Sequence, residues 1–194
     1  MLIVLGGSGS RPPDVPSVAT SPPGASLKIR GDVAAPVEVE EWSDFQCPFC
    51  RQLALDVEPK VLASRVQTGR AKVVWRHFAF LGQESSWAAE ASECANDQGK
   101  FWEYHDKLFA EQAGENRGTF RKDALKRFAS DLGLDRAAFD ACLDGGRHTA
   151  RVAADTAAGR QKGVTVTPTL FVNGRKSEGV PTVAQLEAAI DAAR

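Results

Sequence analysis

The stretch EEWSDFQCPFC, residues 40–50, decides the fold, because it joins an extended segment to two cysteines at the start of a helix. The residues PVEVEEW, at 36–42, alternate apolar and acidic side chains, as a β-strand with one buried face does. Residues 51–69 then carry apolar side chains at helical spacing and end at a glycine. Pro59 falls inside this helix, so we expect a kink there. This order predicts a strand and a helix with both cysteines at the turn between them.

The rest of the chain continues an alternation of strands and helices. Residues 71–80 are rich in β-forming side chains and predict a second strand, parallel to the first through a right-handed crossover. Residues 83–162 show no convincing strand, and their caps, amphipathic spacing and glycine stops predict an all-helical block. Residues 164–172 return to strand composition before an Asn-Gly hairpin signal and a final amphipathic helix over 182–194. The predicted order is therefore βαβ, a helical block, and ββα.

Composition limits the classes of function. The chain has 194 residues, 43% of them hydrophobic, which suits one packed domain with an insertion. Its 24 basic and 25 acidic residues leave a net charge of −1 and no basic run, so there is no electrostatic case for binding nucleic acid. Four cysteines are too few for a small scaffold held together by disulfides. We find no long dimerisation segment and expect a monomer.

The first 26 residues differ from the rest. The apolar start MLIVL is shorter than a secretory signal or a membrane span, so two interpretations stay open: the trailing end of a signal or anchor, or a short leader. The proline-, glycine- and serine-rich residues that follow predict a flexible linker. We expect a leader and linker over 1–26, one domain formed by 27–82 and 163–194, and inserted helices over 83–162.

The chemistry of Cys-Pro-Phe-Cys follows from its place at a helix start. Unpaired N–H groups and the helix dipole stabilise an anion there, and in known cases they lower a thiol pKa from about 8.5 to about 3.5–7.5. Cys47 is the expected nucleophile and Cys50, one turn later, the expected resolving thiol. The alternatives are a structural disulfide and a zinc site, which would need ligands at short spacing. Cys94 and Cys142 each stand alone, so we expect no metal.

Cys94 and Cys142 both fall in the helical block, where two interpretations stay open. They are either small buried apolar side chains or a structural disulfide that joins two helices, which an oxidising compartment permits. The histidines at 77, 105 and 148 lie on different elements without a cysteine or histidine at ligand spacing. We therefore interpret these three histidines as structural or exposed.

The strand before the cysteines carries three acids, and alternation separates them. Glu41 shares a face with Val37 and Val39, whereas Glu38 and Glu40 lie on the other face. This favours an inward Glu41 and a surface position for the other two acids. Burial raises the pKa of a carboxyl, so we expect the pKa of Glu41 to be raised.

Thr167-Pro168 lies between two strand-like runs, where a trans proline in a central strand is disfavoured, and we expect a cis bond. The Thr167 backbone would then face Cys47 and pair with an extended substrate chain. Phe49 projects between the two cysteines and is the best candidate for an exposed apolar rim that binds unfolded chains.

Three segments together resemble the DsbA-like thiol–disulfide oxidoreductases of the thioredoxin fold: EEWSDFQCPFC at 40–50, AAEASECANDQGKFWEYHDKLF at 88–109 and VTVTPTLFVNG at 164–174. The resemblance runs from about residue 27 to the C-terminus. It implies an α/β thioredoxin fold with an all-helical insertion between the second and third core strands. It also implies residue roles: nucleophile for Cys47, resolving cysteine for Cys50, cis-proline for Pro168 and buried proton shuttle for Glu41.

The resemblance further implies an extracytoplasmic enzyme, in the periplasm or cell envelope and with no cofactor, that introduces or exchanges disulfides in exported proteins. Its implied partners are unfolded or partly oxidised exported proteins and a membrane quinone-linked protein that reoxidises or reduces it. The best-known periplasmic members carry a histidine between the cysteines, where this chain has Pro48 and Phe49. Phenylalanine gives the thiolate no positive partner, which leaves room for a reductase or an isomerase. A non-catalytic binding or chaperone module is the remaining alternative.

Overall fold

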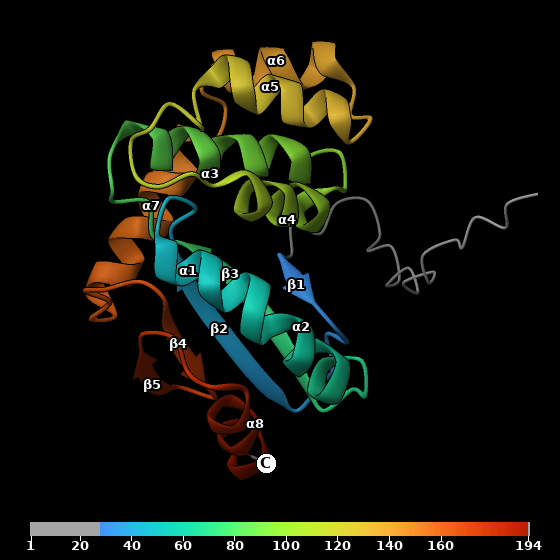
Figure 1. Cartoon of the computed structure of the whole chain (residues 1–194), viewed down its shortest axis with the longest axis vertical. Helices are drawn as coiled ribbons and strands as arrows, with labels where there is room; N and C mark the ends of the chain where they lie inside the picture. Colours follow the sequence, from blue (N-terminus) through green and yellow to red (C-terminus); the bar gives the residue numbers. More distant parts are fainter. Residues whose placement is uncertain (1–27, 194) are drawn as a thin grey trace, which may run out of the picture.

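The structure, a computed structural model, describes residues 28–193, so the leader and linker predicted over 1–26 lie outside the described residues. The strands in the described range are β1 (Ile29–Arg30), β2 (Val37–Ser43), β3 (Ala71–His77), β4 (Thr169–Val172) and β5 (Arg175–Glu178). These described strands form one sheet in the order β1-β3-β2-β4-β5 (Figure 1). β2 and β3 are parallel, as predicted, and the other pairs are antiparallel. The sheet is therefore mixed, with β2 at its centre.

Both faces of β2 are covered, because other elements pack on each side of the central strand. The sequence pattern predicts a surface position for Glu40, and this expectation is wrong, since the residue is only 7% exposed. The Glu40 carboxylate pairs with Arg76 at 3.3 Å and with Lys162, so the buried charge has partners. Glu41 lies on the opposite face of the strand, beneath the helix that follows the cysteines.

The segment after the cysteines is helical throughout but not uniform. It consists of α1 (Pro48–Gln52), a π-helical turn (Leu53–Val57), α2 (Glu58–Val61) and a second π-helical turn (Leu62–Val66). The sequence predicts a kink at Pro59, and the first π-helical turn ends at Val57, two residues before this proline. Pro59 has no N–H to donate to the carbonyl four residues earlier, and the wider turn accommodates that loss. This segment and α8 (Val183–Ala192) cover one face of the sheet.

A further helix, α7 (Thr149–Gln161), packs on the opposite face, and Gly159 allows its close approach. A Cβ atom at Gly159 would lie 2.7 Å from the Phe78 ring and 2.8 Å from the Trp42 ring. The two rings belong to the small apolar cluster on that face of the sheet. Glycine is therefore required at this helix position for packing.

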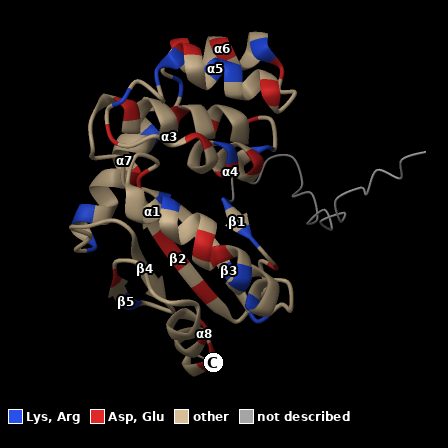
Figure 2. Cartoon of the chain, in the orientation of Figure 1, with Lys and Arg blue, Asp and Glu red and all other residues tan. Residues whose placement is uncertain are grey.

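The residues between β3 and β4 form the helical block that the sequence predicts. Besides α7 it contains α3 (Gln83–Asn96), α4 (Phe101–Glu111), α5 (Lys122–Asp131) and α6 (Arg136–Asp144). Figure 1 shows α3 to α6 stacked at one end of the sheet, and Figure 2 shows acidic and basic residues interspersed on α5 and α6. A buried ion pair of 2.6 Å, Lys28 Nζ to Glu93 Oε1, ties the start of β1 to α3. Among the described helices, none combines the length and apolar character needed to cross a membrane.

The strand predicted over residues 164–172 begins only at Thr169. The preceding residues form a bend, in which the Thr169 hydroxyl donates to the Val166 carbonyl at 2.7 Å. The peptide bond between Thr167 and Pro168 lies in this bend and is cis. The bend carries the Thr167 backbone to the start of α1, where the cysteines lie.

Candidate active site

The two cysteines lie at the junction of β2 and α1. Cys47 is the N-cap residue of α1, and its own N–H donates to the Asp44 carbonyl at 3.0 Å. Its side chain is only 5% exposed, whereas Cys50, inside the first turn, is fully buried. Both cysteines are free thiols in the structure, which therefore represents the reduced pair. A substrate would reach Cys47 first.

The surroundings of Cys47 favour its thiolate. The Cys50 thiol donates a hydrogen bond to the Cys47 sulfur, and this is the main reason that the Cys47 pKa falls to about 6. Burial acts in the opposite direction, while the Thr167 hydroxyl and the N–H groups of Phe49 and Cys50 lower the pKa further. The N–H groups belong to the first turn of α1, so the helix start acts on the thiol as the sequence argument expects. Cys47 is thus largely ionised at neutral pH.

The Cys50 thiol, in contrast to Cys47, has a raised pKa. Burial raises its pKa well above the ordinary value, and the neighbouring Cys47 sulfur raises it further because the two groups share one proton. The nearby Ser43 side chain lowers the Cys50 pKa in part. The pair therefore holds a thiolate at the surface side and a thiol beneath it, which is the arrangement needed for a nucleophile and a resolving group.

The cis-proline bend forms the second wall of the site. The Cys47 sulfur lies 3.3 Å from the Thr167 carbonyl oxygen, to which it donates only when it is protonated. The Thr167 hydroxyl is buried and has no other hydrogen-bond partner among the described residues, which leaves it available to the Cys47 sulfur. Phe49, two residues after Cys47, and Val166, next to Thr167, are exposed by 62% and 44%. An apolar rim therefore borders the sulfur.

The turn before Cys47 is held by polar residues that sequence reasoning missed. The Asp44 carboxylate accepts hydrogen bonds from the N–H groups of Gln46, Phe80 and Leu81 and from the Ser85 hydroxyl, at 2.7–3.1 Å. Burial raises the Asp44 pKa, while these hydrogen bonds oppose the rise. Aspartate between a strand and a helix is a typical turn residue, and this was the signal available in the sequence.

The helical block supports the same turn from the other side. The Gln112 amide, just beyond α4, donates to the carbonyls of Phe45 and Cys47 at 2.6 and 3.1 Å. Arg51 Nε in α1 donates to the Phe109 carbonyl at 3.0 Å. These contacts join residues about 60 positions apart, so no local pattern in the sequence indicates them. They fix the cysteine turn against the inserted helices.

Glu41 lies behind the cysteines, on the inward face on which alternation places it. It is 1% exposed, and the Ser43 hydroxyl donates to its Oε1 atom at 2.5 Å. Burial raises its pKa well above 4.5, and the nearby Glu58 raises it further by repulsion and by a shared hydrogen bond. Glu58, at the start of α2, is itself only 5% exposed and was not singled out from the sequence. Its contact with Glu41 depends on helix-to-sheet packing, which periodicity does not reveal.

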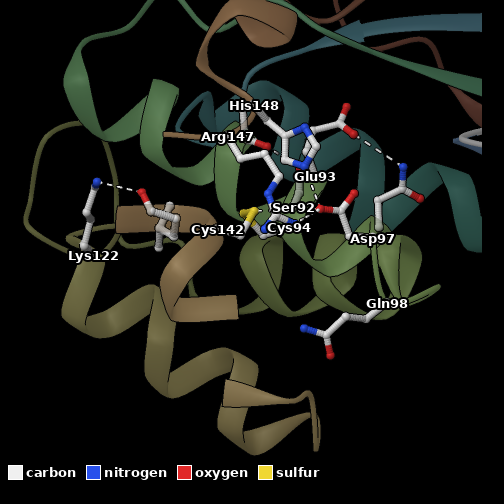
Figure 3. Close-up of a disulfide and its surroundings, with 12 residues drawn as sticks. Ser92, Glu93, Cys94, Asp97, Gln98, Lys122, Cys142, Arg147 and His148 are labelled. Atoms are coloured by element: carbon white, nitrogen blue, oxygen red, sulfur yellow. Dashed lines mark hydrogen bonds and ion pairs between the residues drawn. A yellow bond between two sulfur atoms is a disulfide. The ribbon is translucent and has the colours of Figure 1, made fainter. Parts of the chain in front are cut away.

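Cys94 and Cys142 form a disulfide between α3 and α6, with 5.9 Å between their Cα atoms (Figure 3). The sequence leaves open whether these cysteines are buried apolar side chains or a structural disulfide, and the structure shows the disulfide. Beside it, His148 Nε2 and Arg147 Nη1 lie 2.9 and 3.1 Å from Asp97 Oδ2, as Figure 3 shows. The Cys94–Cys142 disulfide belongs to the inserted helices rather than to the turn that carries Cys47 and Cys50.

His77 lies in a buried charged cluster behind the aromatic core. Its Nδ1 atom accepts from Trp75 Nε1 at 3.0 Å, and its Nε2 atom lies 3.1 Å from Glu93 Oε1. Lys28 Nζ also contacts Glu93 and, at 3.0 Å, Asp155, so an ammonium group already balances these acids. Burial lowers the His77 pKa to about 4, and the ring is neutral at pH 7. These contacts support the structural role that the sequence suggests for this histidine.

Comparisons with known proteins agree on the fold. The profile of a family described as thioredoxin matches residues 26–192. The Na(+)/H(+) antiporter NhaA 3 of Salinispora tropica is 39% identical over 84% of this chain, but the chain spans only 24% of the length of that relative. BdbD from Bacillus subtilis superposes with a TM-score of 0.81 at 24% identity, covering 87% of this chain and 92% of that one. A thioredoxin-like oxidoreductase from Silicibacter pomeroyi gives 0.75 at 28% identity, covering 88% and 93%.

These findings confirm the predicted fold class and the predicted resemblance. The chain has a DsbA-like thioredoxin fold in which α3 to α7 form an insertion between the second and third core strands. Proteins with DsbA in their names are also among its structural neighbours. The Cys47–Cys50 pair lies where a strand of this fold meets the helix that follows it.

Proposed function

The chain belongs to the thioredoxin family whose profile spans residues 26–192, and on that premise we propose that it is a thiol–disulfide oxidoreductase acting through Cys47 and Cys50. One observation carries the proposal: the Cys47 sulfur has its pKa lowered to about 6 and lies 3.3 Å from the Thr167 carbonyl, where a substrate chain can pair. A structural disulfide needs neither a stabilised thiolate nor an apolar rim. The oxidoreductase named among the structural neighbours supports the same reaction class.

The reaction starts from the Cys47–Cys50 disulfide. A substrate thiolate attacks the Cys47 sulfur, a new S–S bond forms to the substrate, and the electron pair of the broken bond goes to Cys50, which takes up a proton. A second substrate thiolate then attacks the substrate sulfur of the mixed disulfide and releases Cys47 as a thiolate. The substrate dithiol is oxidised by two electrons, and the protein disulfide is reduced to the pair seen in the structure.

Electron flow from substrate to protein is the direction we propose. A thiolate stabilised at Cys47 favours the reduced form of the pair, so the disulfide form is the better oxidant. Phe49 adds no positive charge, and the stabilisation comes instead from Cys50, Thr167 and the N–H groups of α1. The redox potential against glutathione tests this direction. A value near that of DsbA, about −120 mV, would support an oxidase, and one near that of thioredoxin, about −270 mV, would support the alternative of a reductase.

The proposed working place is an oxidising, extracytoplasmic compartment. The disulfide between Cys94 and Cys142 supports it, because such bonds persist where thiols are not kept reduced. The proposed substrates are unfolded or partly oxidised exported proteins, whose apolar segments would contact the exposed ring of Phe49. A membrane quinone-linked protein is the proposed partner that reoxidises the reduced pair.

Oxidative refolding of a reduced substrate protein tests the proposal. The oxidised protein should form substrate disulfides, and Cys47→Ser should lose this activity. Cys50→Ala should accumulate a mixed disulfide at Cys47, visible on non-reducing gels. Cys94→Ala/Cys142→Ala is the matched control, since it removes two cysteines distant in sequence from the turn and leaves no new free thiol. Equal oxidation rates for the wild type and Cys47→Ser would refute the proposal.

A further inference from the structure

Two cysteines and a histidine meet at one point of the helical block. The Sγ atoms of Cys94 and Cys142 and a ring nitrogen of His148 all lie within 4.8 Å of one another. The two cysteines come from α3 and α6, and His148 is the N-cap residue of α7, with a side chain only 12% exposed. Thiolate and imidazole are the ligands of structural zinc sites. The expectation of no metal came from the long gaps between these residues in the sequence, and folding closes the gaps.

A carboxylate completes this group of side chains. Asp97, the C-cap residue of α3, places its Oδ2 atom 2.9 Å from His148 Nε2 and 3.9 Å from the Cys142 sulfur (Figure 3). In zinc sites a carboxylate at such a place serves as the fourth ligand or accepts a hydrogen bond from the histidine and so orients its ring. A disulfide between the two cysteines uses neither the ring nor the carboxylate.

The spacing of the three ligand atoms is close to what a bound ion requires. Zinc bonds of about 2.3 Å to sulfur and about 2.0–2.1 Å to nitrogen, at tetrahedral angles, put ligand atoms about 3.5–3.8 Å apart. The Cα atoms of Cys94 and Cys142 are 5.9 Å apart, and their sulfurs are free to separate once the bond between them is open. Rotation of side chains is therefore enough to form the site, and the helices can stay in place.

Contacts other than the disulfide hold α3 against α6. Ala91 on α3 and Phe139 on α6 belong to one buried apolar core. The Gln98 side chain, just beyond α3, donates to the Asp135 carbonyl at 3.1 Å and accepts from the Asp135 N–H at 2.8 Å. Asp135 is the N-cap residue of α6, so this pair of hydrogen bonds fixes the start of that helix. Opening the disulfide thus leaves two thiols side by side next to the histidine.

From this arrangement we propose that the open form of the Cys94–Cys142 pair binds one Zn²⁺ ion through the two sulfurs and His148, with Asp97 completing the site. Binding releases the two thiol protons, because zinc takes the deprotonated sulfur. Oxidation expels the ion. One thiolate attacks a disulfide oxidant, either a small molecule or a protein, and forms a mixed disulfide. The second thiolate attacks the cysteine sulfur of that bond, so two electrons pass to the oxidant, which leaves as two thiolates.

A second group of possible ligands in the described part of the chain has a different character. Its members are His77, Glu93 and Asp155. The Lys28 ammonium contacts both acids, at 2.6 and 3.0 Å, and so already takes the place of a cation there. Beside the disulfide, the basic side chain of Arg147 lies 3.1 Å from Asp97, but it is 58% exposed and can turn toward solvent when an ion binds. The disulfide site is therefore the better candidate for a metal.

The test measures Zn²⁺ binding by the full-length Cys47→Ser/Cys50→Ser variant, which lacks the other pair of thiols. The variant is reduced with a phosphine, freed of metal, and titrated with Zn²⁺ in competition with a chromogenic chelator. The same variant with the disulfide intact is titrated in parallel. We expect one Zn²⁺ per reduced chain and none per oxidised chain. Co²⁺ in place of Zn²⁺ should give the visible absorption of a tetrahedral ion with thiolate ligands.

Substitutions made in the same variant identify the ligands. Asp97→Asn should weaken Zn²⁺ binding by about 10–100-fold, and His148→Ala should weaken it at least as much. Asp140→Asn is the matched control, because its carboxylate also lies on the helical block but pairs with Arg136 at 2.9 Å, and it should leave the affinity unchanged. Zn²⁺ should also raise the thermal unfolding midpoint of the reduced protein and leave that of the oxidised protein unchanged.

Three results would overturn the zinc site: no binding by the reduced protein, equal binding by the reduced and oxidised proteins, or an unchanged affinity in both His148→Ala and Asp97→Asn. Comparison of the reduced and oxidised proteins needs no substitution at the site, so the test holds even where a variant fails to fold. The inference does not depend on the proposed exchange reaction, because the protein used lacks Cys47 and Cys50. Failure of the exchange reaction in the wild type would equally leave the zinc site standing.

Discussion

Replacing Glu41 by glutamine should change how the stability of the protein depends on pH. In the unfolded chain the Glu41 carboxyl has its ordinary pKa of 4.5, and in the folded protein burial and Glu58 raise that pKa well above this value. Between the two pKa values the unfolded chain has lost a proton that the folded protein keeps. Unfolding then releases a proton, so the free energy of unfolding falls as pH rises. Below 4.5 both states are protonated and the group contributes no pH dependence.

The magnitude follows from this linkage. One proton difference changes the free energy of unfolding by about 1.4 kcal/mol for each pH unit. Relative to Glu41→Gln, the wild type should therefore lose stability as pH rises above 4.5. The loss continues until the folded pKa is reached. His77 and Cys47, whose pKa values are lowered to about 4 and about 6, make the protein more stable as pH rises. Both residues are present in the wild type and in the variant, so their contributions cancel in the difference between the two free energies of unfolding.

Urea unfolding of the two reduced proteins from pH 4 to pH 8, with linear extrapolation to water, measures this difference. The glutamine variant should gain stability over the wild type as pH rises. In Glu58→Gln the free energy of unfolding should stop falling at a lower pH than in the wild type. The reason is that burial still raises the Glu41 pKa, but the second carboxyl no longer adds to the rise. A difference between wild type and Glu41→Gln that stays constant across this range, or a wild type that gains stability relative to the variant as pH rises, would refute the raised pKa.

Three other variants test separate parts of the structure. Gly159→Ala should destabilise the protein by about 1–3 kcal/mol in thermal or urea unfolding, because its Cβ would lie 2.8 Å from the Trp42 ring; a loss below 0.5 kcal/mol would contradict that packing. Cys94→Ala/Cys142→Ala opens a loop of 48 residues and should cost up to about 4 kcal/mol, whereas an unchanged unfolding midpoint would argue against the disulfide. Phe49→Ala should raise the KM for an unfolded protein substrate several-fold and leave the rate with glutathione unchanged, since a small thiol does not need the apolar rim; equal KM values would exclude this ring from substrate binding.

The order of elements was predictable because local patterns encode it. The cysteine turn, the parallel pairing of β2 with β3 and the helical character of residues 83–162 follow from periodicity, caps and glycine stops. The later start of β4, at Thr169, was not predictable, because β-branched residues suit a bend next to the cis bond as well as a strand. Strand composition alone does not distinguish the two.

Predictions for the site depended on the range of the contacts. Cys47 and Glu41 lie where the helix start and strand alternation place them, since both arguments concern neighbours in the chain. Glu40 is buried because Lys162 reaches it from beyond α7, a partner that the strand pattern does not contain. Glu58 and Gln112 join the site only through packing between distant elements, so sequence reasoning passed over them.

The pH dependence of Cys47 alkylation tests the central claim most directly. Iodoacetamide reacts with the thiolate, so its rate with the reduced wild type, corrected by a Cys47→Ser blank, follows the ionisation of this sulfur. The structure predicts a midpoint near pH 6, with about nine-tenths of the thiol ionised at pH 7. A midpoint near the free value of about 8.5 would mean that the helix start, Cys50 and Thr167 do not activate the sulfur. That result would contradict a thiol–disulfide oxidoreductase that works through Cys47.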